Sequence, residues 1–297
     1  MSETSTHGIH GDRRDGIYVW NDKINLAVDV ALATGRPLLL RGATGSGKSS
    51  LAMAEAKKRG WRYYEQTITS RTQARELLWE VDQLARFHEA RRSDGDDPLP
   101  VSRYVRPGIL WWAINRESAL GYATAEKDPN FNRDRNGKRV EHERAVVLLD
   151  EIDKADPDVP NNLLVPLGSY RFQIDESMEP IQLERGEPPL IIITSNGERE
   201  LPPAFLRRCV EYFIEDADED RLLTIAKKHF PTIPRQQLKG MFDAIVAARP
   251  SDWNGPALPS PAEFIDCINA IGNLTTVTPA EIARLVVWKS SASERTV

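Results

Sequence analysis

The chain has 297 residues, of which 40% are hydrophobic and 28% are charged, as is usual for a globular protein with a sizeable core. Lysine and arginine number 39 and aspartate and glutamate 44, so the formal net charge is −5. That charge disfavours a protein that coats nucleic acid through a basic surface, and two cysteines without CxxC spacing exclude a disulfide framework and a cysteine-based zinc site.

The amino-terminal segment does not resemble a secretory signal. Residues 1–16 have no apolar core, and we expect them to form a flexible tail. No apolar run in the chain approaches the ~20 residues that cross a bilayer, so no membrane association is expected. The low cysteine count favours the reducing cytoplasm as the location.

The first part of the chain alternates between helical and strand patterns. Apolar residues recur at helical spacing after Asn21, which with Asp22 is a candidate cap, and Gly35 ends the pattern. This alternation predicts a parallel α/β sheet. The expected elements are a helix over 21–34, a strand over 37–40, a helix over 47–59 and a strand over 61–68.

The middle of the chain combines further strands with predicted insertions. Residues 71–90 predict one long amphipathic helix, and the charged stretch 127–144 predicts an exposed segment. Trp111 and Trp112 are adjacent on a predicted helix, so we do not expect both to face one core. The insertions are expected at about 88–108 and 119–144, the strands at 146–149, 191–194 and 210–214, and a hairpin at 170–183.

After Glu215 the pattern becomes helical. Asp218 is a candidate helix cap, and three more helical patterns follow before residue 290. We therefore expect an α/β core over 17–215 and a small all-helical lid over 216–297.

Residues 42–49, Gly-Ala-Thr-Gly-Ser-Gly-Lys-Ser, match the phosphate-loop pattern G-x-x-x-x-G-K-[ST] in full. Glycines allow backbone N–H groups to turn toward phosphate oxygens, and the following helix directs its positive end at the same anion. Lys48 is expected to reach the β- and γ-phosphates, and the Ser49 hydroxyl to bind Mg²⁺. The residues expected to hold the nucleotide are Gly42, Ala43, Thr44, Gly45, Ser46, Gly47, Lys48, Ser49 and Ser50.

An apolar strand pattern, Val146 to Leu149, ends at two adjacent carboxylates, Asp150 and Glu151. A buried parallel strand should end at the active edge of an open sheet. Asp150 is then expected to hold Mg²⁺, and Glu151 to polarise the attacking water.

These motifs resemble those of AAA+ ATPases, and within them the MoxR-like branch. The resemblance rests on GATGSGKS at 42–49, VVLLDEIDKA at 146–155 and IIITSNGERELPPAFLRRC at 191–209. RTQARELLWEVDQLARF and YVRPGILWWA occupy the region where that branch has an insertion, and they resemble a subgroup often found beside von Willebrand A-domain proteins.

The resemblance implies roles for three more residues. Asn196 matches the polar residue that senses γ-phosphate or orients the lytic water. Arg208 matches the arginine finger that acts on a neighbouring subunit's nucleotide, with Arg207 as the alternative. The family also implies ATP and Mg²⁺ as cofactors, a homo-oligomer that is expected to be a hexameric ring, and a chaperone-like action on a protein client, for which a von Willebrand A-domain protein is a candidate.

The sequence departs from the MoxR-like pattern at one position. Ala262, in Pro259-Ser260-Pro261-Ala262-Glu263, stands where a second sensor arginine is expected. This leaves open a nucleotide-gated assembly switch with little turnover. A DNA-directed motor of a defence system also stays open but is not favoured, whereas a small-molecule kinase is disfavoured by the helical tail and the arginine pair.

Overall fold

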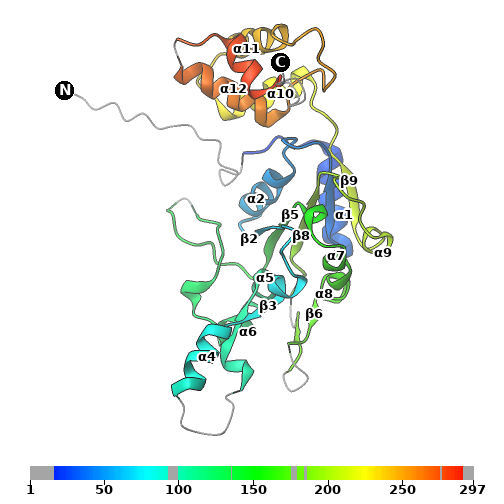
Figure 1. Cartoon of the computed structure of the whole chain (residues 1–297), viewed down its shortest axis with the longest axis vertical. Coiled ribbons are helices and arrows are strands. Elements are labelled where there is room, and N and C mark those ends of the chain that lie inside the picture. Colours follow the sequence, from blue (N-terminus) through cyan, green and yellow to red (C-terminus); the bar gives the residue numbers. More distant parts are fainter. Residues whose placement is uncertain are drawn as a thin grey trace, which may run out of the picture. The chain divides into compact units, whose positions relative to one another are not determined.

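The computed structural model describes residues 17–92, 100–134, 136–174, 179–183, 186–274 and 276–289. The tail expected over residues 1–16 lies outside the described residues. The chain divides into two compact units (Figure 1). The larger unit comprises Trp20–Arg41 and Ala52–Phe213. The smaller unit is built from three segments, namely the residues up to Val19, Gly42–Leu51 and the segment from Ile214 onward.

A five-stranded, all-parallel sheet forms the centre of the larger unit, with the order β2-β5-β8-β1-β9, and confirms the parallel α/β fold. β5 and β8 occupy inner positions, and every residue of both strands is buried. Their hydrophobic composition explains this, because a strand covered on both faces cannot alternate with polar residues. The strands are β1 (Leu38–Arg41), β2 (Arg62–Thr67), β5 (Ala145–Asp150), β8 (Leu190–Ser195) and β9 (Val210–Phe213).

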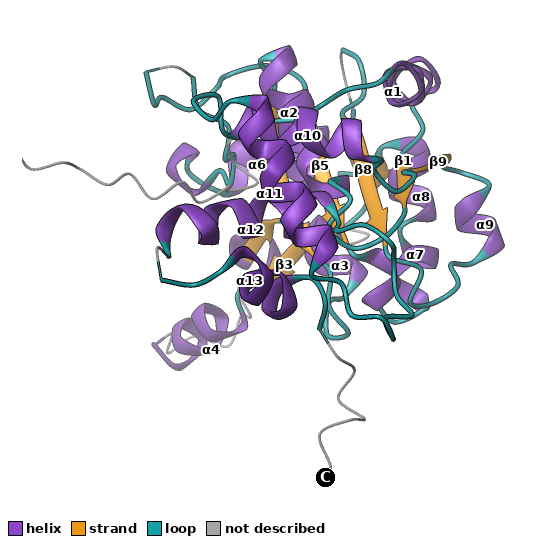
Figure 2. Cartoon of the chain, turned by 90° about the horizontal axis from the view of Figure 1, so that it is seen from above, coloured by secondary structure: helices purple, strands orange, loops and turns teal. Residues whose placement is uncertain are grey.

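Helices cover both faces of this sheet. On one face, alternate strand residues such as Leu39, Val147 and Ile191 share a core with short helices, and α7, α8 and α9 lie near one another in both views (Figures 1 and 2). α1 contacts β1 and β9; the Asn21 side chain accepts a hydrogen bond from the Ile24 amide, and Gly35 ends the helix at φ 63°. The helices are α1 (Asp22–Thr34), α2 (Lys48–Arg59), α7 (Asp158–Asn162), α8 (Leu164–Ser169) and α9 (Pro203–Leu206).

The region predicted as one helix over 71–90 is instead broken in two, and that prediction was wrong. The chain turns into a strand after Leu78, because the Trp79–Val81 segment pairs antiparallel with Val105–Pro107. The expectation for the tryptophan pair was also wrong, since Trp111 and Trp112 are both fully buried in the same core. The elements are α3 (Ala74–Leu78), β3 (Trp79–Val81), α4 (Gln83–Arg92), a 3₁₀ helix (Val101–Tyr104), β4 (Val105–Pro107), α5 (Ile109–Ile114) and α6 (Arg116–Tyr122).

The stretch 127–144 was expected to be exposed, but its first part is anchored along the edge strand β2. Asp128, Asn130 and Asn132 are buried. Asn130 Oδ1 accepts the Tyr63 amide at 2.9 Å, and Asn132 Nδ2 donates to the Trp61 carbonyl at 2.7 Å. Asparagine side chains here replace a missing neighbouring strand, which charge content alone does not reveal.

We predict that Asn130→Ala lowers the free energy of unfolding by about 2–4 kcal/mol. The change removes the acceptor of two buried N–H groups, and an unsatisfied buried N–H group costs about 1–3 kcal/mol. Asn130 Oδ1 also accepts the Asn132 amide, so two donors lose their partner together. Urea unfolding measures the effect. Asn136→Ala, in the exposed part of the same loop, is the matched control and should stay within about 0.5 kcal/mol. Equal losses in the two variants would contradict the anchoring role.

The hairpin expected over 170–183 is present as β6 (Arg171–Phe172) paired antiparallel with β7 (Ile181–Gln182), although residues 175–178 lie outside the described part. Tyr170 precedes it at φ 49°, and its hydroxyl donates to the Gly35 carbonyl at 2.6 Å.

The carboxyl-terminal segment of the smaller unit is helical, as predicted. Ser260 and Thr278 each cap a helix with a reciprocal glutamate three residues on. The helices share one core that includes Leu222, Phe242 and Phe264. They are α10 (Glu219–His229), α11 (Arg235–Ala247), α12 (Pro261–Asn273) and α13 (Pro279–Val286). Within the described ranges, every helix is too short or too polar to cross a membrane.

Candidate functional site

The phosphate loop belongs to the smaller unit and follows β1 directly in the chain. Gly42, Gly45 and Gly47 adopt φ values of 146°, 80° and 95°, a region that other residues rarely occupy. α2 begins at Lys48, one residue after the predicted start. The loop geometry is therefore one that only glycine permits without strain at these three positions.

Lys48 of the loop is buried, and so is the hydroxyl oxygen of Ser46. The Lys48 ammonium donates to the carbonyls of Gly42 and Ala43, both at 2.8 Å. The Ser46 hydroxyl has no hydrogen-bond partner among the residues that the structure describes. A buried cation with a buried, unpartnered hydroxyl beside glycine amides suits a phosphate group, which accepts many hydrogen bonds.

The start of α12 packs against this loop within the same unit. The Ala262 amide donates to the Gly45 carbonyl at 3.3 Å. A Cβ built on Gly45 would lie 2.6 Å from the Ser260 hydroxyl and 3.3 Å from the Ala262 Cβ. Ala262, where the sensor arginine was expected, thus lies against the phosphate loop, and a small side chain suits that close approach.

We predict that Gly45→Ala lowers stability and weakens nucleotide binding, because the new methyl group would both strain φ and overlap Ser260. The loss of unfolding free energy should be about 2–4 kcal/mol, measured by thermal unfolding, with nucleotide affinity measured by fluorescence titration. Gly60→Ala is the matched control, since Gly60 has φ 67° and open space around its Cβ position. It should cost about 1–2 kcal/mol and leave nucleotide binding unchanged. Equal effects of the two changes would rule out the packing on Ser260.

In the larger unit, the acidic pair lies at the carboxyl end of β5. Asp150 is buried, and its Oδ1 accepts the Thr194 hydroxyl at 2.6 Å. Glu151 adopts φ 63° and ψ 49°, a left-handed conformation that is uncommon for a residue other than glycine. Its carboxylate accepts Lys154 Nζ at 2.8 Å and Asn196 Nδ2 at 3.3 Å. The hydrogen bond to Glu151 raises the pKa of the Lys154 ammonium, so this lysine stays charged at neutral pH.

Asn196 lies just beyond β8, next to the acidic pair. Its amide and that of Glu198 both donate to Asp153 Oδ2, at 3.1 and 2.8 Å. Asp153 is buried and follows the acidic pair by two residues. The turn after β8 is therefore tied to the turn after β5, and Asn196 reaches Glu151.

The arginine pair follows α9 and is exposed. The Arg36 guanidinium donates to the carbonyls of Arg207 and, at 3.1 Å, Arg208. Behind the pair, burial raises the pKa of the Cys209 thiol to about 12, which keeps it protonated and unreactive. Both guanidinium groups are thus presented at the surface from an anchored backbone.

The sequence analysis missed four residues of this arrangement: Thr194, Asp153, Lys154 and Arg36. Thr194 is a polar residue at the end of an aliphatic strand pattern, and that was the signal available for it. Asp153 stands among other charged residues in the sequence, so its burial left no such signal. Lys154 lies within hydrogen-bonding reach of Glu151 at the i, i+3 position. Nothing in the local sequence indicated Arg36, because its partners lie more than 170 positions away.

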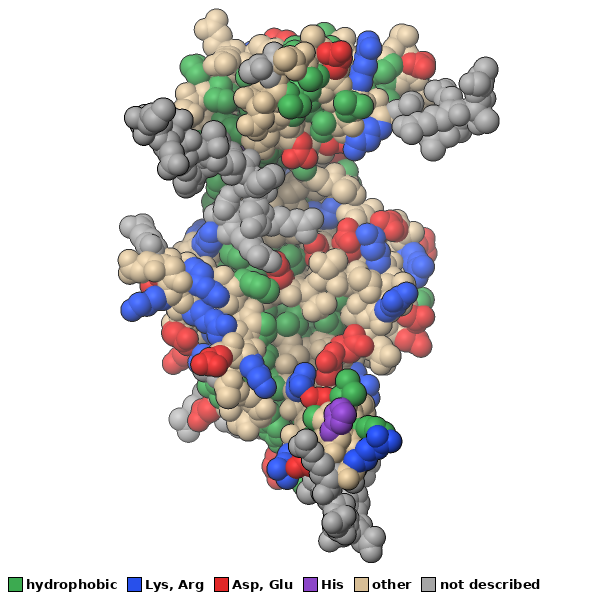
Figure 3. Space-filling view, turned by 60° about the vertical axis from the view of Figure 1, so that its left-hand side comes forward, with side chains coloured by type: hydrophobic (Ala, Val, Ile, Leu, Met, Phe, Trp, Pro, Cys, Tyr) green, Lys and Arg blue, Asp and Glu red, His purple; other side chains and the backbone are tan. Residues whose placement is uncertain are grey.

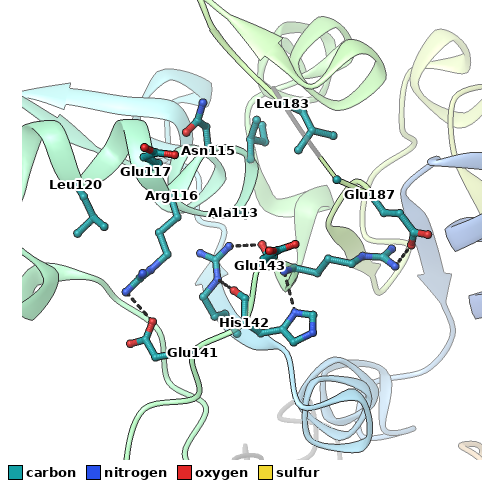
Figure 4. Close-up of a pocket in the computed structure, with 14 residues that line it drawn as sticks. Ala113, Asn115, Arg116, Glu117, Leu120, Glu141, His142, Glu143, Leu183 and Glu187 are labelled. Carbon is teal, nitrogen blue, oxygen red and sulfur yellow. Dashed lines mark hydrogen bonds and ion pairs between the residues drawn. The ribbon is translucent and has the colours of Figure 1, made fainter.

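The larger unit also contains a cavity of about 1030 Å³, which is separate from these residues (Figure 4). It lies where strands begin: Arg62 opens β2, Arg144 precedes β5 and Glu187 precedes β8. Arg116 and Glu141, two of its lining residues, point toward each other and form an ion pair at 3.0 Å. Because parallel strands begin and end at opposite edges, this cavity lies away from Asp150.

A parallel sheet with a glycine-rich phosphate loop after β1 and a carboxylate pair after β5 defines a P-loop nucleotide-binding protein. The model of the AAA domain (dynein-related subfamily) matches residues 37–209, more than half of the chain. The chain therefore belongs to the AAA domain family.

Comparison with solved structures and curated proteins adds little. A crystal structure of an ATPase candidate from Cytophaga hutchinsonii ATCC 33406 aligns over 93% of this chain and 82% of its own, with 13% identity and a TM-score of 0.40. At so low a TM-score, this likeness supports no conclusion about the function of the chain. No curated protein matches the sequence.

Proposed function

We propose that this protein is a Mg²⁺-dependent ATPase that works as a ring, hexameric by its MoxR-like resemblance, and remodels a partner protein. The observation that carries the proposal is the arrangement of Asp150, Glu151 and Asn196 at the carboxyl ends of β5 and β8. Membership of the AAA domain family supports nucleotide binding.

The phosphate loop, residues 42–50, is proposed to grip the triphosphate through its backbone amides and Lys48. Ser49 and Asp150 are proposed to hold Mg²⁺, which, when bound, neutralises charge on the phosphates. Mg²⁺ takes one or two protein oxygens with phosphate and water, so a single carboxylate and a hydroxyl fit it.

Glu151 is proposed to accept a proton from the attacking water. Asn196, whose side-chain amide donates to the Glu151 carboxylate, is proposed to orient that carboxylate. Arg208, or failing it Arg207, is proposed to stabilise charge on the nucleotide of a neighbouring subunit. Its exposure in a single chain agrees with a role across an interface. A core over 17–215 and a helical lid over 216–297, moving as nucleotide is turned over, are proposed to transmit force to the client, for which a von Willebrand A-domain protein is the candidate.

A nucleotide-gated switch with little turnover is the second candidate function. Ala262 favours it, because the α12 start contacts the phosphate loop through backbone and small side chains and supplies no arginine. A DNA-directed motor has less support. On the face shown in Figure 3, Lys and Arg side chains are mixed with Asp and Glu side chains, and no continuous basic surface is seen there.

We predict that Glu151→Gln leaves ATP affinity within about twofold and lowers steady-state phosphate release by about 10²–10⁴-fold, since the amide cannot act as a base. Glu198→Gln, the same change at an exposed neighbouring position, is the control and should keep full activity. Wild-type protein that assembles on ATP without releasing phosphate would favour the switch. Robust hydrolysis by Glu151→Gln would remove Glu151 from the mechanism.

We predict that Arg208→Ala preserves ATP binding and lowers ring activity by about 10³-fold or more. A ring assembled from equal amounts of Arg208→Ala and Glu151→Gln subunits should recover about a quarter of wild-type activity. In such rings about one subunit interface in four pairs an intact Glu151 with an intact Arg208 from the neighbour. Light scattering checks assembly, and Arg207→Ala tests the alternative finger. Mixtures as inactive as either variant alone would argue against action in trans.

A further inference from the structure

Thr194 lies within β8, in the centre of the sheet, and is fully buried. Its hydroxyl donates to Asp150 Oδ1 at 2.6 Å and accepts the Glu151 amide at 2.8 Å. One oxygen of β8 therefore contacts both members of the acidic pair at the end of β5.

The direction of these two bonds is fixed by the donors available. The Glu151 amide can only donate, so the single hydroxyl proton of Thr194 points to Asp150. Asp150 Oδ1 is thus an acceptor, and its donor is a buried side chain of the central strand.

The same hydroxyl holds the unusual backbone of Glu151. A left-handed conformation at a residue with a Cβ persists only where its surroundings impose it. The bond from the Glu151 amide to Thr194 and the bond from the Lys154 amide to the Glu151 carbonyl, at 3.0 Å, fix that residue from both sides. The left-handed turn directs the Glu151 side chain toward Asn196 and Lys154.

A hydroxyl is not needed at position 194 to build the sheet. The preceding β8 residues, Leu190 to Ile193, are aliphatic, and valine would fill the same volume as threonine. Its neighbour Ser195 is also buried, and among the described residues the contact of its hydroxyl is with the Gly197 amide, which it accepts at 3.1 Å.

We infer that Thr194 is a positioning residue that couples the metal-side carboxylate Asp150 to the backbone of the proposed base Glu151. This inference rests on the proposed function. Loss of the hydroxyl should loosen both carboxylates at once, as losing a hydrogen-bond partner of a metal ligand does elsewhere, by about 10–100-fold in metal affinity or rate.

The test compares Thr194→Val, Thr194→Ser and the control Ser195→Ala in the full-length protein. Titration with fluorescent ATP in the presence of EDTA measures the affinity for nucleotide without metal. Titration of the ADP complex with Mn²⁺, followed by electron paramagnetic resonance, measures the affinity for metal. Phosphate release measures the rate of turnover. Thr194→Val should keep metal-free affinity within about twofold and lose about 10–100-fold in Mn²⁺ affinity and in turnover. Thr194→Ser and Ser195→Ala should stay within about threefold of wild type on both.

The inference is overturned if folded Thr194→Val binds Mn²⁺ and turns over like wild type, or if Ser195→Ala shows the same losses. Should Thr194→Val fail to fold, Thr194→Ser still decides, because a stable serine variant with weakened Mn²⁺ binding contradicts a role for the hydroxyl. Wild-type protein that binds no nucleotide overturns the proposed function itself, whereas active wild type with an unaffected valine variant overturns only the role of Thr194.

Discussion

Burial of β5 and β8 in the centre of the sheet is the constraint on which the candidate site depends. Polar groups at the carboxyl ends of these strands have little access to water, so they must satisfy one another. The Thr194 hydroxyl donates a hydrogen bond to Asp150 and accepts one from the Glu151 amide. The Asp153 carboxylate accepts hydrogen bonds from two amides of the turn after β8. The carboxylates, the amide of Asn196 and the turns that carry them therefore form one network of hydrogen bonds.

The phosphate loop is shaped by a different principle, which is steric. Its glycines occupy backbone conformations closed to other residues, and Gly45 also leaves room for Ser260 and Ala262 at the start of α12. A movement of the loop on binding a phosphate would meet α12 directly, through the bond between the Ala262 amide and the Gly45 carbonyl. In this chain, contact between the loop and the helical segment depends on small side chains and backbone, at the position where the sequence pattern led us to expect an arginine.

The family match covers the segment that holds both the phosphate loop and the acidic pair, and it establishes an AAA domain. Beyond the family match, the structure shows particular contacts in this chain: Lys154 and Asn196 contact Glu151, Arg36 supports the backbone of the arginine pair, and asparagines anchor a loop along β2. Each is a hydrogen bond or ion pair between residues whose types are common. Their meaning therefore depends on their position in the fold.

The parallel α/β class, the positions of the sheet strands and the glycine-rich loop after β1 could be predicted from the amino-acid sequence, because strand burial and glycine-rich turns leave local patterns. The sequence did not predict that 71–90 breaks into two helices with a strand between them, that Trp111 and Trp112 share one core, or that Asn130 is buried. Those outcomes depend on partners distant in the chain, such as Val105–Pro107 for β3 and Tyr63 for Asn130. The tertiary structure alone decided that Thr194 contacts both acidic residues, because neighbours across a parallel sheet are set by strand order, which no local pattern records.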